Sequence, residues 1–161
     1  MIRHEQIGIF ILNPKITKFI QIKKSTELTI SMNPDVEEKE YIADKNASKE
    51  LKAYAPQIDQ PLTMLENEED FKYFFDLFFK QAPGEDAKTK CLIVFKFQGN
   101  PTDGYKAWQT DCLIEFNEMN TYDSNLEFSI DFAGDTEKGV VKMVDGEPTF
   151  AGGEADVQIN L

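Results

Sequence analysis

A strict alternation of polar and apolar side chains runs through Asn125-Leu-Glu-Phe-Ser-Ile-Asp-Phe132. In an extended chain, successive side chains point to opposite faces, so the apolar residues of this stretch share one face. The members of that face are Leu126, Phe128, Ile130 and Phe132. This period of two is typical of a β-strand that lies with one face against a core and the other face in water.

Strand-like segments precede and follow this stretch. They are Glu27–Met32, Cys91–Phe97, Trp108–Phe116 and Val140–Val144. The apolar run in Cys91–Phe97 is typical of a strand that is buried on both faces. The turn-rich segments Gly134–Gly139 and Asp145-Gly146 predict hairpins on either side of Val140–Val144. Consecutive short strands joined by such turns predict a mainly β (α+β) fold built on an antiparallel β-sandwich or barrel.

One amphipathic α-helix is predicted at about residues 67–81. Five phenylalanines recur at helical spacing and share one face, namely Phe71, Phe74, Phe75, Phe78 and Phe79. Asn67 is a candidate N-cap, and Pro83-Gly84 would end the helix. Buried aromatic side chains chiefly supply packing area, so we expect this stripe to flank the β-sheet. The alternative is that the stripe lines a ligand cavity.

Length and composition fit a single domain that spans residues 1–161. Of these residues 41% are hydrophobic and 29% are charged, which is enough apolar material for a core and excludes wholesale disorder. No apolar run approaches the roughly 20 residues of a membrane-spanning helix. No cleavage pattern of a secretory signal follows the apolar stretch Ile7–Leu12. We therefore expect no membrane partner, and two cysteines suit a reducing compartment.

The charge is strongly negative and unevenly distributed. The formal net charge is −12, which makes binding to DNA through phosphate contacts unfavourable. Residues 1–25 are an exception, because they hold five basic residues against one glutamate. We interpret them as a basic N-terminal arm or strand that is either solvated or laid on the acidic body of a neighbouring subunit.

Side chains suited to catalysis or metal binding are scarce. His4 is the only histidine and lies at the N-terminus, so the sequence offers neither a cluster of imidazole ligands nor a histidine relay. Cys91 and Cys112 lie in apolar strand patterns, where a thiol behaves as a small hydrophobe. No calcium-binding or phosphate-binding loop motif is present. The sequence therefore predicts no enzymatic activity, no metal and no cofactor.

A long charged segment, about residues 33–56, has no predicted role in the core. Its 24 residues contain six acids and four lysines, and loops of this length in compact domains are usually functional or disordered. Tyr41, Ile42 and Tyr54 are apolar residues in this polar context, as at protein-binding surfaces. We expect the loop to be disordered or loosely packed in a free subunit and to become ordered when it docks on another protein.

Six segments carry a resemblance to a known protein family. They are Glu40–Lys45, Tyr54–Gln57, Glu69–Tyr73, Cys112–Phe116, Asn125–Ile130 and the turn from Gly134 to Gly139. A small antiparallel β domain with one flanking helix and a long charged loop resembles the tail tube (major tail) proteins of tailed phages and prophages, over about residues 25–150. The resemblance implies subunits of two packed sheets, hexameric rings, and a loop that stacks one ring on the next. It also implies an electronegative lumen through which DNA passes without specific binding.

The resemblance implies roles for particular residues. Those of the stacking loop are Glu40, Tyr41, Ile42, Asp44, Lys45 and Tyr54. In a tube, some polar strand faces would line the channel, and alternation provides four candidate lumen-facing acids. These acids are Asp111, Glu115, Glu127 and Asp131. The same acids could equally lie on the outer surface.

The partners implied are further copies of the chain, other tail proteins and passing DNA, in a virion tail that is assembled in the host cytoplasm. Two other functions remain open. A monomeric or dimeric β-barrel could be a ligand- or protein-binding module, with the phenylalanine-rich helix lining its pocket. A tail-terminator or connector protein would use a similar domain but form a single ring. Long tubes, discrete rings and monomers differ in mass, so the assembly state separates the three.

Overall fold

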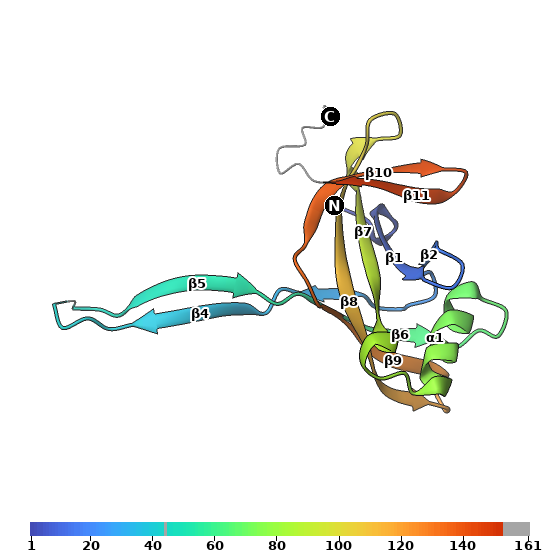
Figure 1. Ribbon diagram of the computed structural model, residues 1–161, viewed down its shortest axis with the longest axis horizontal. Coiled ribbons are helices and arrows are strands. Elements are labelled where there is room, and N and C mark those ends of the chain that lie inside the picture. Colours follow the sequence, from blue (N-terminus) through green and yellow to red (C-terminus); the bar gives the residue numbers. More distant parts are fainter. Residues whose placement is uncertain (44, 153–161) are drawn as a thin grey trace.

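The computed structural model describes residues 1–43 and 45–152 of the chain (Figure 1). The strands of its main sheet are β1 (Ile7–Asn13), β2 (Lys18–Gln21), β3 (Thr29–Ser31), β6 (Gln57–Thr63), β7 (Lys88–Asn100), β8 (Gly104–Asn120), β9 (Asn125–Phe132), β10 (Glu137–Val144) and β11 (Glu147–Gly152). The fold is mainly β, an antiparallel β-sandwich with one flanking helix, as the sequence predicted.

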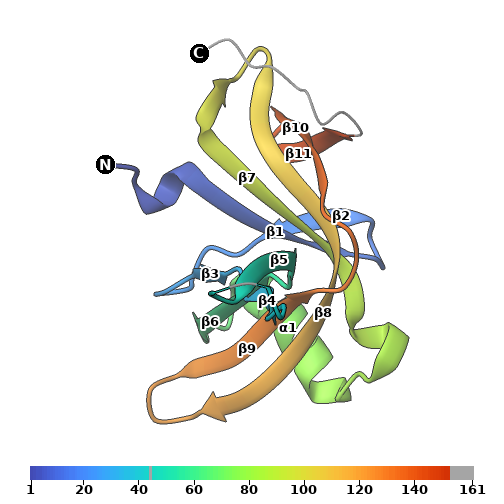
Figure 2. The same cartoon turned by 90° about the vertical axis from the view of Figure 1, so that its left-hand side faces the viewer.

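The remaining elements lie outside this sheet. A separate two-stranded sheet consists of β4 (Pro34–Lys39) and β5 (Ser48–Tyr54). The helix α1 spans Glu69–Lys80, and the short 3-10 helices η1 (His4–Gln6) and η2 (Gly84–Ala87) precede β1 and β7. Figures 1 and 2 show β4–β5 projecting from one side of the body, with α1 on the other side.

The long strand β8 organises the main sheet. Neighbouring strands run antiparallel in the order β2-β1-β7-β8-β9-β6-β3. The second half of β8 pairs with β9 and its first half, Tyr105–Gln109, pairs with β10. The sequence predicted a hairpin at Gly134–Gly139 between the strands now seen as β9 and β10, and this prediction is wrong. Because β8 extends well beyond the end of β9, the chain bends there and continues along the same edge of β8.

The second predicted turn is confirmed. Asp145-Gly146 joins β10 to β11, and both residues have positive φ values of 52° and 79°. Two consecutive residues with positive φ are the requirement of a type I′ hairpin turn.

The larger hydrophobic core lies on the face of the sheet that α1 covers. Its fully buried members include Ile9, Ile11, Ile58, Leu62, Cys91, Ile93, Cys112, Leu126 and Ile130. Residues of β1 and β7 share this core with residues of β6 and β9, so the sheet curves around it. The alternations predicted for Trp108–Phe116 and Asn125–Phe132 are confirmed on this face. Ser129, which the alternation placed in solvent, is buried on the opposite face.

Helix α1 is turned relative to its predicted orientation. Phe74 is fully buried and packs on Phe128, with ring centroids 4.3 Å apart. Phe75 and Phe79 were predicted to face the sheet, but they are 41% and 76% exposed. The phenylalanine stripe is therefore only partly a core stripe.

A buried carboxylate explains this orientation. Asp70 Oδ2 accepts hydrogen bonds from the backbone N–H groups of Lys23 (3.0 Å) and Lys24 (3.2 Å), and Asp70 is only 2% exposed. This anchor turns position 70 inward, and helical spacing then brings Phe74 and Leu77 inward after it. The N-cap is Glu68, one residue later than the predicted Asn67, and the helix begins at Glu69.

Residues 1–25 contribute strands to the sheet. β1 and β2 pair as a hairpin, and Ile9, Phe10 and Ile11 are buried. Phe10 packs with Leu92 and Val141 in a second, smaller core that joins β1 and β7 to β10. The apolar run in β1 is buried on both faces, so this part of the segment is not a free arm.

Candidate assembly surfaces

Residues 33–56 form a β-hairpin arm (Figure 1). The two strands pair from Pro34 opposite Tyr54 to Lys39 opposite Ser48, with a bulge after Asp35. Every residue of both strands is exposed. The sequence predicted a long charged loop here, and the structure shows two paired strands in its place. The ordering of this segment on docking to another protein stays a prediction. We call residues 33–56 the arm.

The sequence does not predict this hairpin, because neither of its faces is buried and neither strand therefore shows hydrophobic alternation. One ion pair joins the two strands, with Lys52 Nζ of β5 lying 2.9 Å from Glu37 Oε2 of β4. A second lies within β5, where Lys52 Nζ is 3.1 Å from Glu50 Oε2. Hydrogen bonds to these two glutamates raise the pKa of Lys52. A two-stranded hairpin with both faces in water is marginally stable by itself. The arm therefore presents two faces on which a partner could pack.

The predicted stacking residues fall into two groups. Glu40, Tyr41, Ile42 and Lys45 lie at or beside the tip of the arm, whereas Tyr54 lies at its base. Asp44 lies outside the described residues. Ile42 is fully exposed and Tyr41 is 56% exposed, so the tip presents apolar surface to solvent.

All four candidate lumen acids lie on one face of the sheet, opposite α1. The register places Asp131 opposite Leu113 and Ser129 opposite Glu115, so acids of β8 and β9 alternate on this face. Glu127 lies further along β9, and Asp111 lies beyond Leu113 on β8. We call this surface the acidic face. The strand alternation therefore located its members correctly relative to the core.

The carboxylates of the acidic face occur as close pairs. The main cause that raises the pKa of Glu115 is the hydrogen bond that its protonated carboxyl group donates to the carboxylate of Asp131. Glu118 lies directly opposite Glu127, and the pKa of Glu127 is raised by a hydrogen bond to Glu118 and by the repulsion between the two charges. Like charges that face each other across paired strands destabilise a sheet. This repulsion lowers the stability of the folded subunit, and the fold does not require these carboxylates to lie together.

The sequence analysis did not identify two further acids of the acidic face, Asp59 and Glu118. Asp59 on β6 lies opposite Ser129, whose hydroxyl donates to Asp59 Oδ1 at 2.7 Å. Strict alternation along β8 would turn Glu118 toward the core, but the register shifts between Phe116 and Glu118 and turns it to the acidic face. Asp59 follows from the alternation of β6 once that strand is recognised, whereas the bulge has no clear sequence signal.

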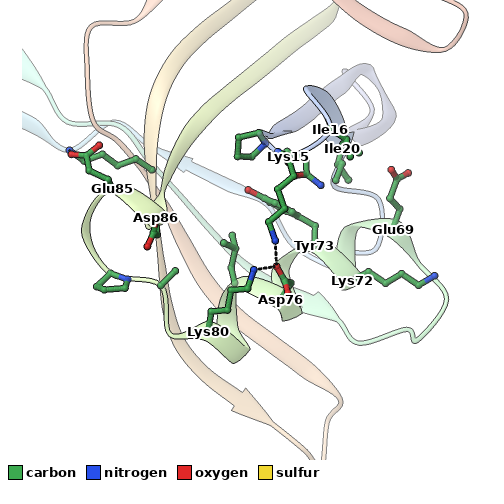
Figure 3. A pocket seen from close by; sticks show the side chains of 16 residues that line it. Lys15, Ile16, Ile20, Glu69, Lys72, Tyr73, Asp76, Lys80, Glu85 and Asp86 are labelled. Carbon is green, nitrogen blue, oxygen red and sulfur yellow. Dashed lines mark hydrogen bonds and ion pairs between the residues drawn. The ribbon is translucent and has the colours of Figure 1, made fainter.

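A groove lies between α1, the β1–β2 turn and η2 (Figure 3). Its volume is about 740 Å³. Its apolar lining comes from Pro14, Ile16, Ile20, Leu77, Ala82 and Pro83. Tyr73 forms part of the wall and donates its hydroxyl to the carbonyl of Leu12 at 3.3 Å, and burial raises its pKa to about 12. We call this hollow the helix groove.

The charges of the helix groove are unevenly placed. Lys15 and Lys80 share the carboxylate of Asp76, at 3.4 Å and 3.0 Å, and the hydrogen bond from Lys80 is the main cause that lowers the pKa of Asp76. Lys72 forms no ion pair with any described residue. The edge formed by α1 and the β1–β2 turn therefore carries excess positive charge. Glu85 and Asp86 lie at the η2 end, away from Lys72 (Figure 3).

The histidine, cysteine and acidic side chains of the described residues were candidates for a metal centre. Residues 1–43 and 45–152 contain no group of three or more His, Cys, Asp or Glu side chains placed to hold a metal ion. Cys91 and Cys112 are free and buried, and burial raises the pKa of Cys112 to about 12 and that of Cys91 well above its ordinary value. No helix in this part of the chain is long and apolar enough to span a membrane.

Comparison with known proteins gives structural neighbours only. No family model matches the sequence, and no curated protein matches it. A chain from the tail of an empty gene transfer agent (GTA) particle, determined by helical refinement with C6 symmetry, has a TM-score of 0.59 and 12% identity to this chain. A chain from the virion of a native GTA particle has a TM-score of 0.57 and 12% identity. Each alignment covers 84% of this chain and 97% of the other. The likeness shows a shared fold over almost the whole of both neighbours.

Proposed function

We propose that the chain is a structural subunit of a phage-type tail tube, which assembles into stacked, six-membered rings around a channel for DNA. The observation that carries this proposal is the fold shared with a chain of a C6-symmetric particle tail, over 97% of that chain. A shared fold is compatible with several functions. The two surfaces described above supply the independent support.

The arm supports self-assembly. It projects from the body, both its faces are exposed, and its tip carries Tyr41 and Ile42 in solvent. A subunit that meets no partner gains nothing from such an extension, whereas a stacked subunit can bury it against the next ring. The further partners are other tail proteins, in a virion tail assembled in the host cytoplasm.

The acidic face supports a channel. Its close carboxylate pairs, Glu115–Asp131 and Glu118–Glu127, destabilise the isolated subunit. A channel wall of like charge would repel the phosphates of passing DNA and keep it from binding. We therefore assign Asp111, Glu115, Glu127 and Asp131, together with Asp59 and Glu118, to the lumen. In this function the chain is not an enzyme, and DNA passes without specific contacts.

Mass photometry and negative-stain microscopy of the purified chain test the proposal. We expect rings at low concentration and tubes at higher concentration, with sixfold symmetry in end-on views. Discrete single rings that never stack would point instead to a tail terminator or connector. A chain that stays monomeric at every concentration would contradict the proposal and favour a binding module.

A further inference from the structure

We propose that the helix groove of one subunit receives the tip of the arm of a second copy of this chain. This inference rests on the proposed function, because it names the acceptor surface for the stacking arm. It concerns two features that lie on opposite sides of the subunit and do not contact each other within residues 1–43 and 45–152. The argument proceeds from the chemistry of the tip, the shape of the groove, their charges and their placement.

The tip is built to enter a hollow rather than to lie on a flat surface. Tyr41 and Ile42 are adjacent and exposed at the turn of the hairpin, where only a narrow end of the chain is presented. Burial of exposed apolar side chains in a pocket lowers the free energy by about 25 cal/mol per Å² of apolar area removed from water. Their neighbours Glu40 and Lys45 are both exposed and place one charge of each sign beside the apolar pair.

The groove has the complementary shape. Its volume of about 740 Å³ is large enough for several side chains, and apolar pockets of about 300–1,000 Å³ are typical of binding sites. Ile16 is 58% exposed at its mouth, while Ile20 forms a buried floor. Seating Tyr41 and Ile42 there would cover apolar surface on both partners.

The charges of the tip and the groove also match. The edge near α1 carries Lys15, Lys72 and Lys80 against Asp76 and Glu69, and Glu69 is paired with Lys18, whereas Lys72 has no ionic partner among the described residues. The η2 end carries Glu85, Asp86 and Lys88, and because Lys88 is paired with Glu85 at 3.1 Å, Asp86 is the acid that remains for a cation of the tip. Glu40 would lie at the lysine edge and Lys45 at the acidic end. In a chain with net charge −12, an edge with excess lysine is an unusual feature, and an acidic strand such as β4 suits it.

The placement of the two features allows an open chain of contacts. The arm leaves the body on the side opposite α1, and both views agree on this (Figures 1 and 2). A tip and a groove on opposite sides form a heterologous contact, in which each copy can donate its arm to one neighbour and receive the arm of another. Contacts of this kind repeat from copy to copy without limit unless the rotation between copies closes them into a ring. Unlimited repetition is what the stacking of rings requires.

A cysteine cross-link tests the contact directly. Ile42→Cys and Ile16→Cys are combined in the full chain, under conditions in which the parent assembles. Both positions are exposed, so folding is preserved, and the native Cys91 and Cys112 are buried and do not compete. We expect a ladder of disulfide-linked oligomers on a non-reducing gel that collapses to monomer with reductant. The matched control pairs Ile42→Cys with Tyr122→Cys, a 95% exposed position in the β8–β9 turn, and should remain monomeric.

A charge exchange supplies the second measurement. Lys72→Glu should raise the concentration needed for assembly by up to about fivefold, since an exposed ion pair contributes at most about that factor to an association constant. Adding Glu40→Lys to Lys72→Glu should restore most of the loss, whereas Glu40→Lys added to the parent should weaken assembly.

The outcomes separate this inference from the proposed function. If the parent forms tubes but the Ile42→Cys/Ile16→Cys chain cross-links no faster than the control, the acceptor surface lies elsewhere and the inference is overturned while the proposed function stands. An additive loss in the Lys72→Glu/Glu40→Lys chain would overturn it in the same way. A parent that never leaves the monomeric state overturns both.

Discussion

The carboxyl groups of Glu115 on β8 and Asp131 on β9 share a hydrogen bond across two paired strands, and this contact raises the pKa of Glu115. Asp131 lies two residues along β9 from Ser129, the partner of Glu115, so the two acids meet diagonally on the same face. On β6, Gln57 and Asp59 face the same area, and the Asp59 carboxylate is held by the hydroxyl of Ser129. The subunit therefore keeps two carboxyl groups together where their mutual repulsion opposes folding at neutral pH.

The first prediction is a pH dependence of stability. Because the folded-state pKa of Glu115 is raised, the stability gained from its bound proton is fully present below the ordinary pKa of a glutamate, about 4.3, and is lost as the pH rises through the raised value. Glu115→Gln removes the repulsion, so we expect a higher melting temperature than the parent at pH 7 and a smaller difference at about pH 5. Differential scanning calorimetry from pH 5 to pH 8 measures this.

The matched control for that measurement is Glu38→Gln on the arm, which also removes one negative charge. It should leave the pH profile of the melting temperature unchanged. The window stops at pH 5 because Asp76, whose pKa is lowered by Lys80, contributes stability that is lost as the pH falls through its folded pKa, below about 3.9. An equal rise in melting temperature at pH 5 and pH 8 for Glu115→Gln would contradict the prediction.

The second prediction tests the orientation of α1. Phe74 is fully buried against Phe128, so Phe74→Ala should lower the free energy of unfolding by about 3–5 kcal/mol. Phe79 is 76% exposed on the same helix, and Phe79→Ala should change it by no more than about 0.5 kcal/mol. Urea denaturation of the two variants gives the comparison. Similar losses for both would mean that the phenylalanine stripe as a whole faces the core.

Much of the main sheet could be predicted from the sequence, because burial of one strand face produces a readable period of two. Asn125–Phe132 and Trp108–Phe116 show this, as does the two-sided apolar run of β7. The pairing of β10 with β8 could not be predicted, since it depends on the unused edge of a strand 17 residues long. Strand length and edge occupancy are properties of the assembled sheet and leave no local pattern.

The candidate surfaces were harder to predict from the sequence than the main sheet, for two physical reasons. The arm lacks a buried face, so its strands have no hydrophobic period even though their backbones are paired on both sides of a bulge. The orientation of α1 depends on one long-range contact, from Asp70 to the backbone of Lys23 and Lys24, and five phenylalanines at helical spacing do not reveal which of them this contact turns away. Only the acids that alternate with core residues, such as Glu127 and Asp131, were located by the sequence.

The third prediction concerns removal of the arm. Its base is closed by hydrogen bonds, with the Ala55 backbone N–H donating to the Met32 carbonyl at 3.1 Å and Asn33 Nδ2 donating to the Ala55 carbonyl at 3.1 Å. Replacing residues 36–52 with an Asn-Gly turn should therefore leave the body folded, because Asp35 and Ala53 are already paired. We expect the parent circular dichroism spectrum and no tubes by negative-stain microscopy. Normal tubes from this variant would show that the arm does not stack the rings.

The last prediction concerns the acidic face. Glu127→Lys combined with Asp131→Lys would place two cations where the proposed channel wall is acidic and would replace repulsion of DNA by contacts with its phosphates. Assembled tubes of this variant should retain DNA at low salt, and the retention should fall steeply as salt rises, because neutralised phosphates release counterions. The matched control is Asp145→Lys combined with Glu147→Lys at the exposed β10–β11 turn, which changes the net charge equally. Filter binding of labelled DNA over a salt series measures both. If the two variants retain DNA to the same extent, net charge alone explains the effect, and Glu127 and Asp131 do not line the channel.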